Sequence, residues 1–122
     1  MDNKHQKRRF RFTDQDRPIV IESLNAFYKA QFHLTGFEYP EIHEMISRAE
    51  ALPMQDNKYE LWLRNKEEHN ILRQSLYELY VYKRENGKSW DRTWDIYCKA
   101  DQAPTADEIR KERVQQSRGE RV

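Results

Sequence analysis

The stretch that decides the fold is NKEEHNILRQSLYELYVY, residues 65–82. Its apolar residues recur at three- and four-residue spacing, which is typical of one face of an α-helix. Asn65 and Glu68 precede this pattern as a capping box, in which the first side chain accepts from first-turn amides and the second reaches back. We therefore expect a long helix from Asn65 to about Asn86-Gly87. The residues on its core-like stripe are Leu72, Leu76, Leu79 and Tyr80.

The same helix carries more apolar surface than a single face accounts for. Ile71, Tyr77, Val81 and Tyr82 widen the stripe, so the helix is either central to the fold or part of an interface. Tyrosine and tryptophan are enriched at protein interfaces. We take Tyr77, Val81 and Tyr82 as candidate protein-binding residues. The alternative is that the aromatic rings form the core of a small helical bundle.

Helical patterns also occur before this stretch. Apolar residues repeat at helical spacing over residues 16–34, and Gly36 offers the left-handed conformation that a C-terminal cap needs. Pro40 then opens a second, shorter helix, which we expect to span residues 41–51. Two helices are therefore predicted on the N-terminal side.

Two more helices are predicted after Gly87. Ser89 can cap a helix that carries Trp90 and Trp94 on one face. Residues 105–108 repeat the capping-box pattern before a last helix with few apolar anchors. The two together could form a helix-turn-helix, although a solvated amphipathic helix is the default interpretation.

Two segments allow either helix or strand. Residues 17–22 contain a β-branched triplet that could begin as a strand. Residues 57–64 alternate like a strand, yet their helical surroundings favour a helix there. The sequence also does not decide whether a short two-stranded ribbon joins residues near Phe10 to those near Leu61.

These patterns predict an all-α fold: a small bundle of four or five helices, with or without the short ribbon. We divide the chain into a basic N-terminal arm over residues 1–12, a helical domain over residues 13–100, and a charged C-terminal helix or tail over residues 101–122. No apolar run approaches the roughly 20 residues that span a bilayer. With a single cysteine, Cys98, no internal disulfide can form, so we expect a cytoplasmic protein without membrane contact.

Catalytic and cofactor motifs are missing from the sequence. The four histidines lie in four separate segments and form no helical metal-binding pair. Glycine occurs only at positions 36, 87 and 119, which excludes the glycine-rich loops that hold phosphates. We therefore expect a protein that is not an enzyme and that binds neither a metal nor a cofactor.

Charge patterning points to a binding role instead. Cations interleave with two aromatic residues in the N-terminal arm, a composition suited to phosphate contact and base stacking. The alternative is a short edge strand with both rings against the body. Further cations lie on the last helix. The candidate nucleic-acid-binding residues are Lys4, Lys7, Arg8, Arg9, Phe10, Arg11, Phe12, Arg110, Lys111 and Arg113.

The sequence thus predicts a non-catalytic regulatory or accessory binding protein, with nucleic acid as the favoured partner. A protein-binding inhibitor, adaptor or subunit that uses the aromatic helix face is the alternative. The oligomeric state and the identity of the partner do not follow from these patterns.

Overall fold

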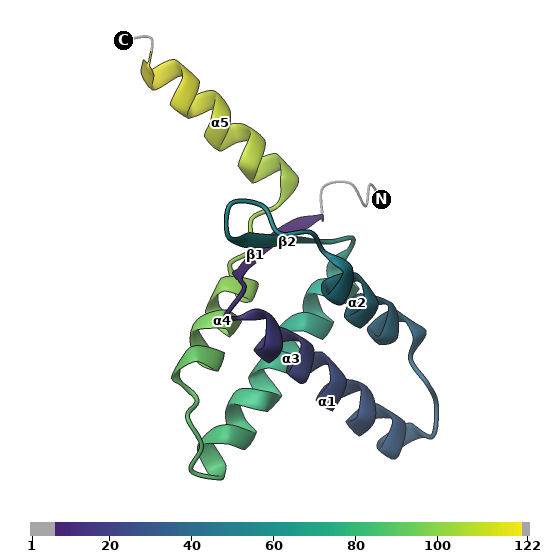
Figure 1. Ribbon diagram of the computed structural model, residues 1–122. Coiled ribbons are helices and arrows are strands. Elements are labelled where there is room, and N and C mark those ends of the chain that lie inside the picture. The colour runs from purple at the N-terminus through teal and green to yellow at the C-terminus, as the bar shows by residue number, and fades with distance from the viewer. Residues whose placement is uncertain (1–6, 121–122) are drawn as a thin grey trace.

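Two short strands lie across one end of a layer of helices (Figure 1). The computed structural model describes residues 7–120. The elements follow the order β1 (Arg8–Thr13), α1 (Arg17–Thr35), α2 (Pro40–Ala51), β2 (Lys58–Leu63), α3 (Lys66–Glu85), α4 (Asp91–Asp101) and α5 (Ala106–Glu120). The fold is 66% helical, with five helices and one two-stranded antiparallel sheet.

The sheet buries one face against the helices. β1 and β2 pair antiparallel with Phe10 opposite Leu61 and Phe12 opposite Tyr59. These side chains are buried, and the rings of Phe10 and Phe12 stack with their centroids 5.2 Å apart. Since successive side chains of a strand point to opposite faces, the residues between them face away from the helices.

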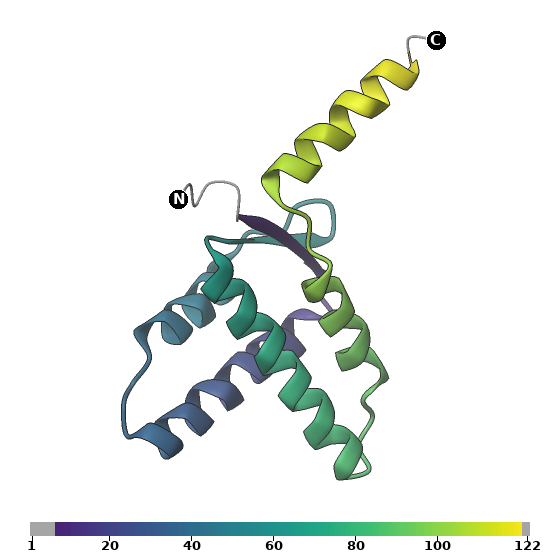
Figure 2. The ribbon, with the colours of Figure 1, turned by 180° about the vertical axis from the view of Figure 1, so that it is seen from behind.

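Helix α3 is the centre of the helical layer. It packs against α1 on one side and α4 on the other, and α2 covers the end of α1 near β2 (Figures 1 and 2). Leu72 and Leu76 of α3 are fully buried, together with Leu24 of α1 and Met45 of α2. The core therefore runs from the inner face of the ribbon into the space between the helices.

Helix α5 projects from the rest of the fold. Its first turn is fixed to β1, because the Ala106 amide donates to the Lys7 carbonyl (3.0 Å) and the Arg9 amide donates to the Pro104 carbonyl (2.9 Å). Ile109 is buried, but Val114 is 48% exposed. The rest of α5 extends away from the ribbon on the side opposite the helical layer (Figures 1 and 2).

The predicted helical bundle is confirmed, and so is the short ribbon that joins residues near Phe10 to those near Leu61, so the fold is mostly helical and not all-α alone. Residues 17–22 are helical, but residues 58–63 form β2 instead of the helix that we favoured. A two-residue turn precedes β2. Its residues Asp56 and Asn57 have φ values of 52° and 66°, and Gln55 and Lys58 exchange both backbone hydrogen bonds (2.9 Å each). Such a turn starts strands and not helices.

The expected cap of α4 also differs. The residue at the N-cap is Trp90, without a side-chain cap, and Ser89 is exposed. At α3 the Asn65 cap is confirmed, because Asn65 Oδ1 accepts from the Glu68 amide (2.9 Å), whereas the Glu68 side chain reaches back to the Arg64 amide (2.8 Å) and not to that of Asn65. Among residues 7–120, no helix is long and apolar enough to cross a membrane.

Candidate nucleic-acid interface

The outer face of the ribbon carries several cations. In the register of the two strands, Arg9 lies opposite Trp62, Arg11 opposite Glu60, and Thr13 opposite Lys58. All of these side chains face away from the helices because Phe10, Phe12 and Leu61 occupy the inner face. The ribbon thus separates a buried apolar face from an outer face rich in cations.

Glu60 is the one carboxylate of the ribbon. Its Oε1 lies 3.5 Å from the Nε of Arg9 and 3.5 Å from the Nε of Arg11. The Arg9 side chain is only 15% exposed, whereas that of Arg11 is 51% exposed. Glu60 therefore orients two guanidinium groups that both keep further N–H donors for another acceptor.

A hollow of about 330 Å³ lies where β1 meets the C-terminal end of α4. We call it the basic hollow. Four cations line it, and among the described residues no carboxylate does. Lys99 Nζ also lies 3.6 Å from Asp16 Oδ2, which fixes that ammonium group near the hollow. The four cations are Arg9, Arg11, Lys58 and Lys99.

A second hollow, of about 740 Å³, lies beside β2 between the end of α2 and the start of α5. We call it the tryptophan pocket. Leu52, Pro53 and Trp62 give it an apolar wall, while Lys7 and Arg64 bring positive charge. Trp62 is 39% exposed, so part of its indole is accessible to a ligand.

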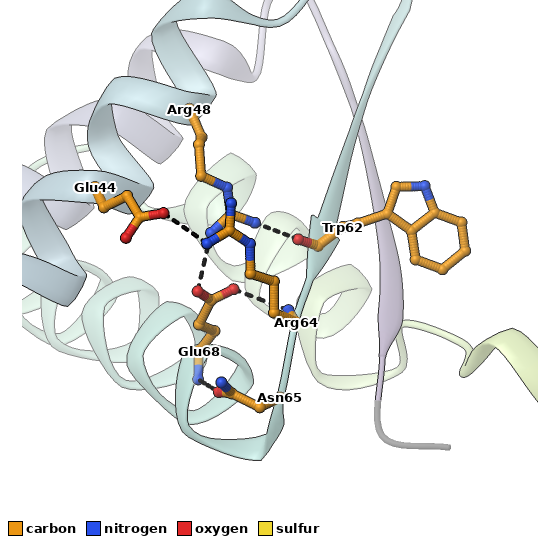
Figure 3. A network of polar contacts seen from close by, with 6 residues as sticks. All are labelled: Glu44, Arg48, Trp62, Arg64, Asn65 and Glu68. Atoms are coloured by element: carbon orange, nitrogen blue, oxygen red, sulfur yellow. Dashed lines mark hydrogen bonds and ion pairs between the residues drawn. The ribbon is translucent and has the colours of Figure 1, made fainter. Parts of the chain in front are cut away.

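A polar network holds the end of β2 that carries Trp62 (Figure 3). Arg48 of α2 donates to the Trp62 carbonyl and to Glu68 Oε2 (2.9 Å). Glu68 Oε1 accepts from the Arg64 amide (2.8 Å), and Arg64 Nη1 donates to Glu44 Oε1 (2.6 Å). The network fixes the backbone, and the indole extends away from it (Figure 3).

The structure places the predicted arm residues in different settings. Phe10 and Phe12 are 0% and 1% exposed, so the base-stacking role suggested for them is wrong and the edge-strand alternative applies. Arg8 donates to the Ala103 carbonyl (2.8 Å) and so ties β1 to the end of α4. Lys7 is exposed, and Lys4 lies outside the described residues.

The cations predicted on the last helix do not join the ribbon face. Arg110, Lys111 and Arg113 are exposed on α5, and Arg110 pairs with Asp107 at 2.9 Å. Helix α5 extends away from α4 rather than packing across it, so the pair does not form a helix-turn-helix (Figure 2). These three cations lie on a separate projection.

The candidate protein-binding residues do not share one face of α3, since Tyr77 lies near α4 and Tyr82 lines a groove beside α1. Tyr77 is 47% exposed and Tyr82 51% exposed, while Val81 is half-buried. Tyr77 is not isolated, since its ring lies 5.6 Å from that of Tyr97. Tyr80, on the predicted core stripe, is buried against Trp94.

Sequence reasoning missed three members of the interface, Lys58, Trp62 and Lys99. Lys58 and Trp62 could be identified only if residues 58–63 were known to form a strand, because the two-residue alternation of a strand places them beside Arg11 and Arg9. The alternation itself was the available signal. Nothing local indicates that Lys99 lies near β1, since that contact joins segments nearly ninety residues apart in the chain.

One titratable group is buried close to this end of the fold. His69 Nε2 lies 2.8 Å from the Ala100 carbonyl oxygen, so this nitrogen carries the hydrogen that it donates. Burial lowers the pKa of His69 from its ordinary value of 6.5, and the positive charges of Arg8 and Arg73 add to that shift. The hydrogen bond to Ala100 and the charge of Asp101 act in the opposite direction.

We expect acid to destabilise the fold through His69. Because the folded pKa lies below the unfolded value, the unfolded chain binds the proton first, and stability is lost as the pH falls below about 6.5. The slope is at most about 1.4 kcal/mol per pH unit. Urea unfolding between pH 7 and pH 5 measures it. His69→Gln should flatten the profile, His43→Gln at an exposed position should not, and a flat wild-type profile would contradict the assignment.

Two further findings bear on function. Within residues 7–120, no group of three or more histidine, cysteine, aspartate or glutamate side chains is placed to hold a metal ion. No protein-family model, curated protein or solved structure matches the chain. The interface therefore has to be interpreted from its own chemistry.

Proposed function

We propose that the protein is a non-catalytic nucleic-acid-binding protein that contacts phosphates through the outer face of its β-ribbon. The observation that carries this proposal is the basic hollow, where four cations gather and no carboxylate of the described chain lines the wall. Phosphate contacts supply most of the affinity in sequence-independent binding. Arg11 and Lys58, both exposed, are its most accessible donors.

The shape of the fold supports the same proposal. An antiparallel ribbon of two strands fits the major groove of a duplex, and several DNA-binding proteins use one. Helix α5 starts at the same ribbon and extends away from the helical layer (Figure 1). A nucleic acid on the ribbon would therefore pass close to α5, whose exposed cations include Arg110 and Arg113.

The binding measurement follows the anisotropy of a labelled duplex and a labelled single strand over a range of salt concentrations. Neutralisation of one phosphate by each cation of the basic hollow gives a log–log slope of about −3.6 on duplex DNA. Arg11→Gln should make that slope shallower by about 0.9, because one contact is lost. Lys29→Gln, on an exposed part of α1 away from the ribbon, is the matched control and should change nothing.

A second substitution is expected to change the affinity for nucleic acid in the opposite direction. Glu60→Gln removes the carboxylate that Arg9 and Arg11 share, so affinity should rise by roughly two- to fivefold. Point substitutions in the full chain are required, because residues 8–13 are a strand of the core sheet and their deletion would unfold it. Wild-type protein that binds neither nucleic acid at about 50 mM salt would overturn the proposal.

A protein-binding role is the alternative, and one feature favours it. A groove of about 300 Å³ lies between α1 and α3, and Ala26, Phe27, Leu79 and Tyr82 are among the residues that line it. Desolvation raises the pKa of Glu78, which also lines this groove. If the protein does not bind nucleic acid, the role as an inhibitor, adaptor or subunit becomes the favoured function.

A further inference from the structure

The exposed Trp62 and the pocket around it have no role in phosphate contact alone. We propose that the tryptophan pocket binds an unstacked nucleobase, with Trp62 as the stacking surface and with Lys7 and Arg64 beside the attached phosphate. This inference rests on the proposed nucleic-acid-binding function and adds to it a preference for unpaired nucleotides. It assigns to Trp62 the stacking that the buried Phe10 and Phe12 cannot perform.

The pocket has the composition of a base-binding site. Its volume of about 740 Å³ lies in the range of small-ligand sites, which are mostly apolar with a few placed polar groups. Leu52 and Pro53 form an apolar wall near the indole. Aromatic side chains beside a cationic surface are the usual platform for single-stranded nucleic acid, because every base has a π-face.

Trp62 is also held rigidly enough to act as a platform. Its backbone is paired with Arg9 in the ribbon, and its carbonyl oxygen accepts from Arg48, which Glu68 fixes in turn at 2.9 Å (Figure 3). Because the backbone is fixed in this way, only the side-chain torsions of Trp62 have to be ordered on binding. The indole itself remains 39% exposed and therefore open to a ligand.

The charges around the pocket indicate where the phosphate and the base of a nucleotide would lie. Glu60 lines part of the pocket and would repel a phosphate, although Arg9 and Arg11 offset its charge. The exposed Lys7 and Arg64, whose Nη1 also donates to Glu44 Oε1 (2.6 Å), line the pocket as well and supply the attraction. The phosphate is therefore expected on the side of Lys7 and Arg64, with the base over Trp62.

The experiment combines tryptophan fluorescence with anisotropy on the full chain. Trp90 and Trp94 lie on the other side of the fold, against Tyr80. In a Trp90→Phe/Trp94→Phe variant, Trp62 is the remaining tryptophan, and oligothymidylate should quench its emission. Thymidine monophosphate is tested in parallel, because the same pocket chemistry would also accept a free nucleotide. Quenching by either supports the site, and quenching by neither overturns it.

The affinity arm uses Trp62→Ala, with Trp62→Phe as the conservative variant. Affinity for oligothymidylate should fall by about fivefold to a hundredfold in Trp62→Ala and recover in part in Trp62→Phe. Affinity for duplex DNA and the salt slope should stay within twofold of wild type, because the phosphate contacts remain. Circular dichroism checks that Trp62→Ala is folded, which its exposed position predicts.

The outcomes separate this inference from the proposed function. Trp62→Ala that binds the single strand as wild type does, while Arg11→Gln weakens binding, would overturn the base site and leave the ribbon proposal standing. Wild-type protein that binds no strand, no duplex and no nucleotide would overturn both. Equal losses on single strand and duplex would show that Trp62 supports the ribbon and does not receive a base.

Discussion

Replacing Phe10 by alanine is expected to lower the free energy of unfolding by about 3–5 kcal/mol. The Phe10 ring is 0% exposed and stacks on Phe12 in the centre of the inner ribbon face, opposite Leu61. Its removal leaves a cavity between the ribbon and the helices that the rigid strand pair cannot close. Urea unfolding followed by circular dichroism at 222 nm measures the loss, and a chain this small has little stability in reserve.

Phe37→Ala is the matched control for this prediction. Phe37 lies between α1 and α2 and is 70% exposed, so the same truncation should change the free energy of unfolding by no more than about 0.5 kcal/mol. Equal, small effects at the two positions would show that Phe10 does not belong to the core. The base-stacking interpretation of the N-terminal segment would then return.

Most of the helices could be predicted from the sequence because their signals are local. The Leu72 and Leu76 stripe, the Asn65 cap and the Gly36 terminator each lie within one helix or next to it. Such patterns survive without knowledge of what packs on them. This is why the bounds of α1 and α3 agree with the expected ones to within about a residue.

The ribbon could not be settled in the same way, because its stability comes from pairing between distant segments. Phe10 and Leu61 are fifty-one positions apart, and neither strand alone shows whether the other will lie beside it. The deciding local feature is the turn at Asp56 and Asn57, both in the left-handed region. That dipeptide is a weaker turn signal than Asn-Gly, and the helix prediction for residues 57–64 was based on their helical surroundings alone.

The candidate site depended on the same pairing. Arg9 and Arg11 were identified from charge and aromatic interleaving, whereas Trp62 lies on the outer face only because residues 58–63 form a strand that pairs with β1. The role of Phe10 was mistaken because interleaved cations and aromatics describe both an exposed arm and an amphipathic strand. Alternation with period two fits both, and burial distinguishes them.

Glu68→Ala is expected to cost about 2–3 kcal/mol of stability, near the low end for a buried ion pair that loses one partner. The Glu68 side chain is 10% exposed and accepts from Arg48 and from the Arg64 amide. Without it, the Arg48 guanidinium, 20% exposed, keeps only the Trp62 carbonyl as a partner among residues 7–120. Urea unfolding measures the loss, and Glu68→Gln should recover part of it because an amide oxygen can still accept.

Glu44→Ala provides the control, because its pair with Arg64 is half-exposed on both sides and should contribute no more than about 1 kcal/mol. A double-mutant cycle with Arg48→Ala then isolates the pair itself. If the charges stabilise each other, Arg48→Ala/Glu68→Ala should be less destabilised than the sum of the two single variants, since no uncompensated charge remains. Strict additivity would show that Glu68 acts through the Arg64 amide alone. The contact between Arg48 and Glu68 would then not contribute to the stability of the β2 end that carries Trp62.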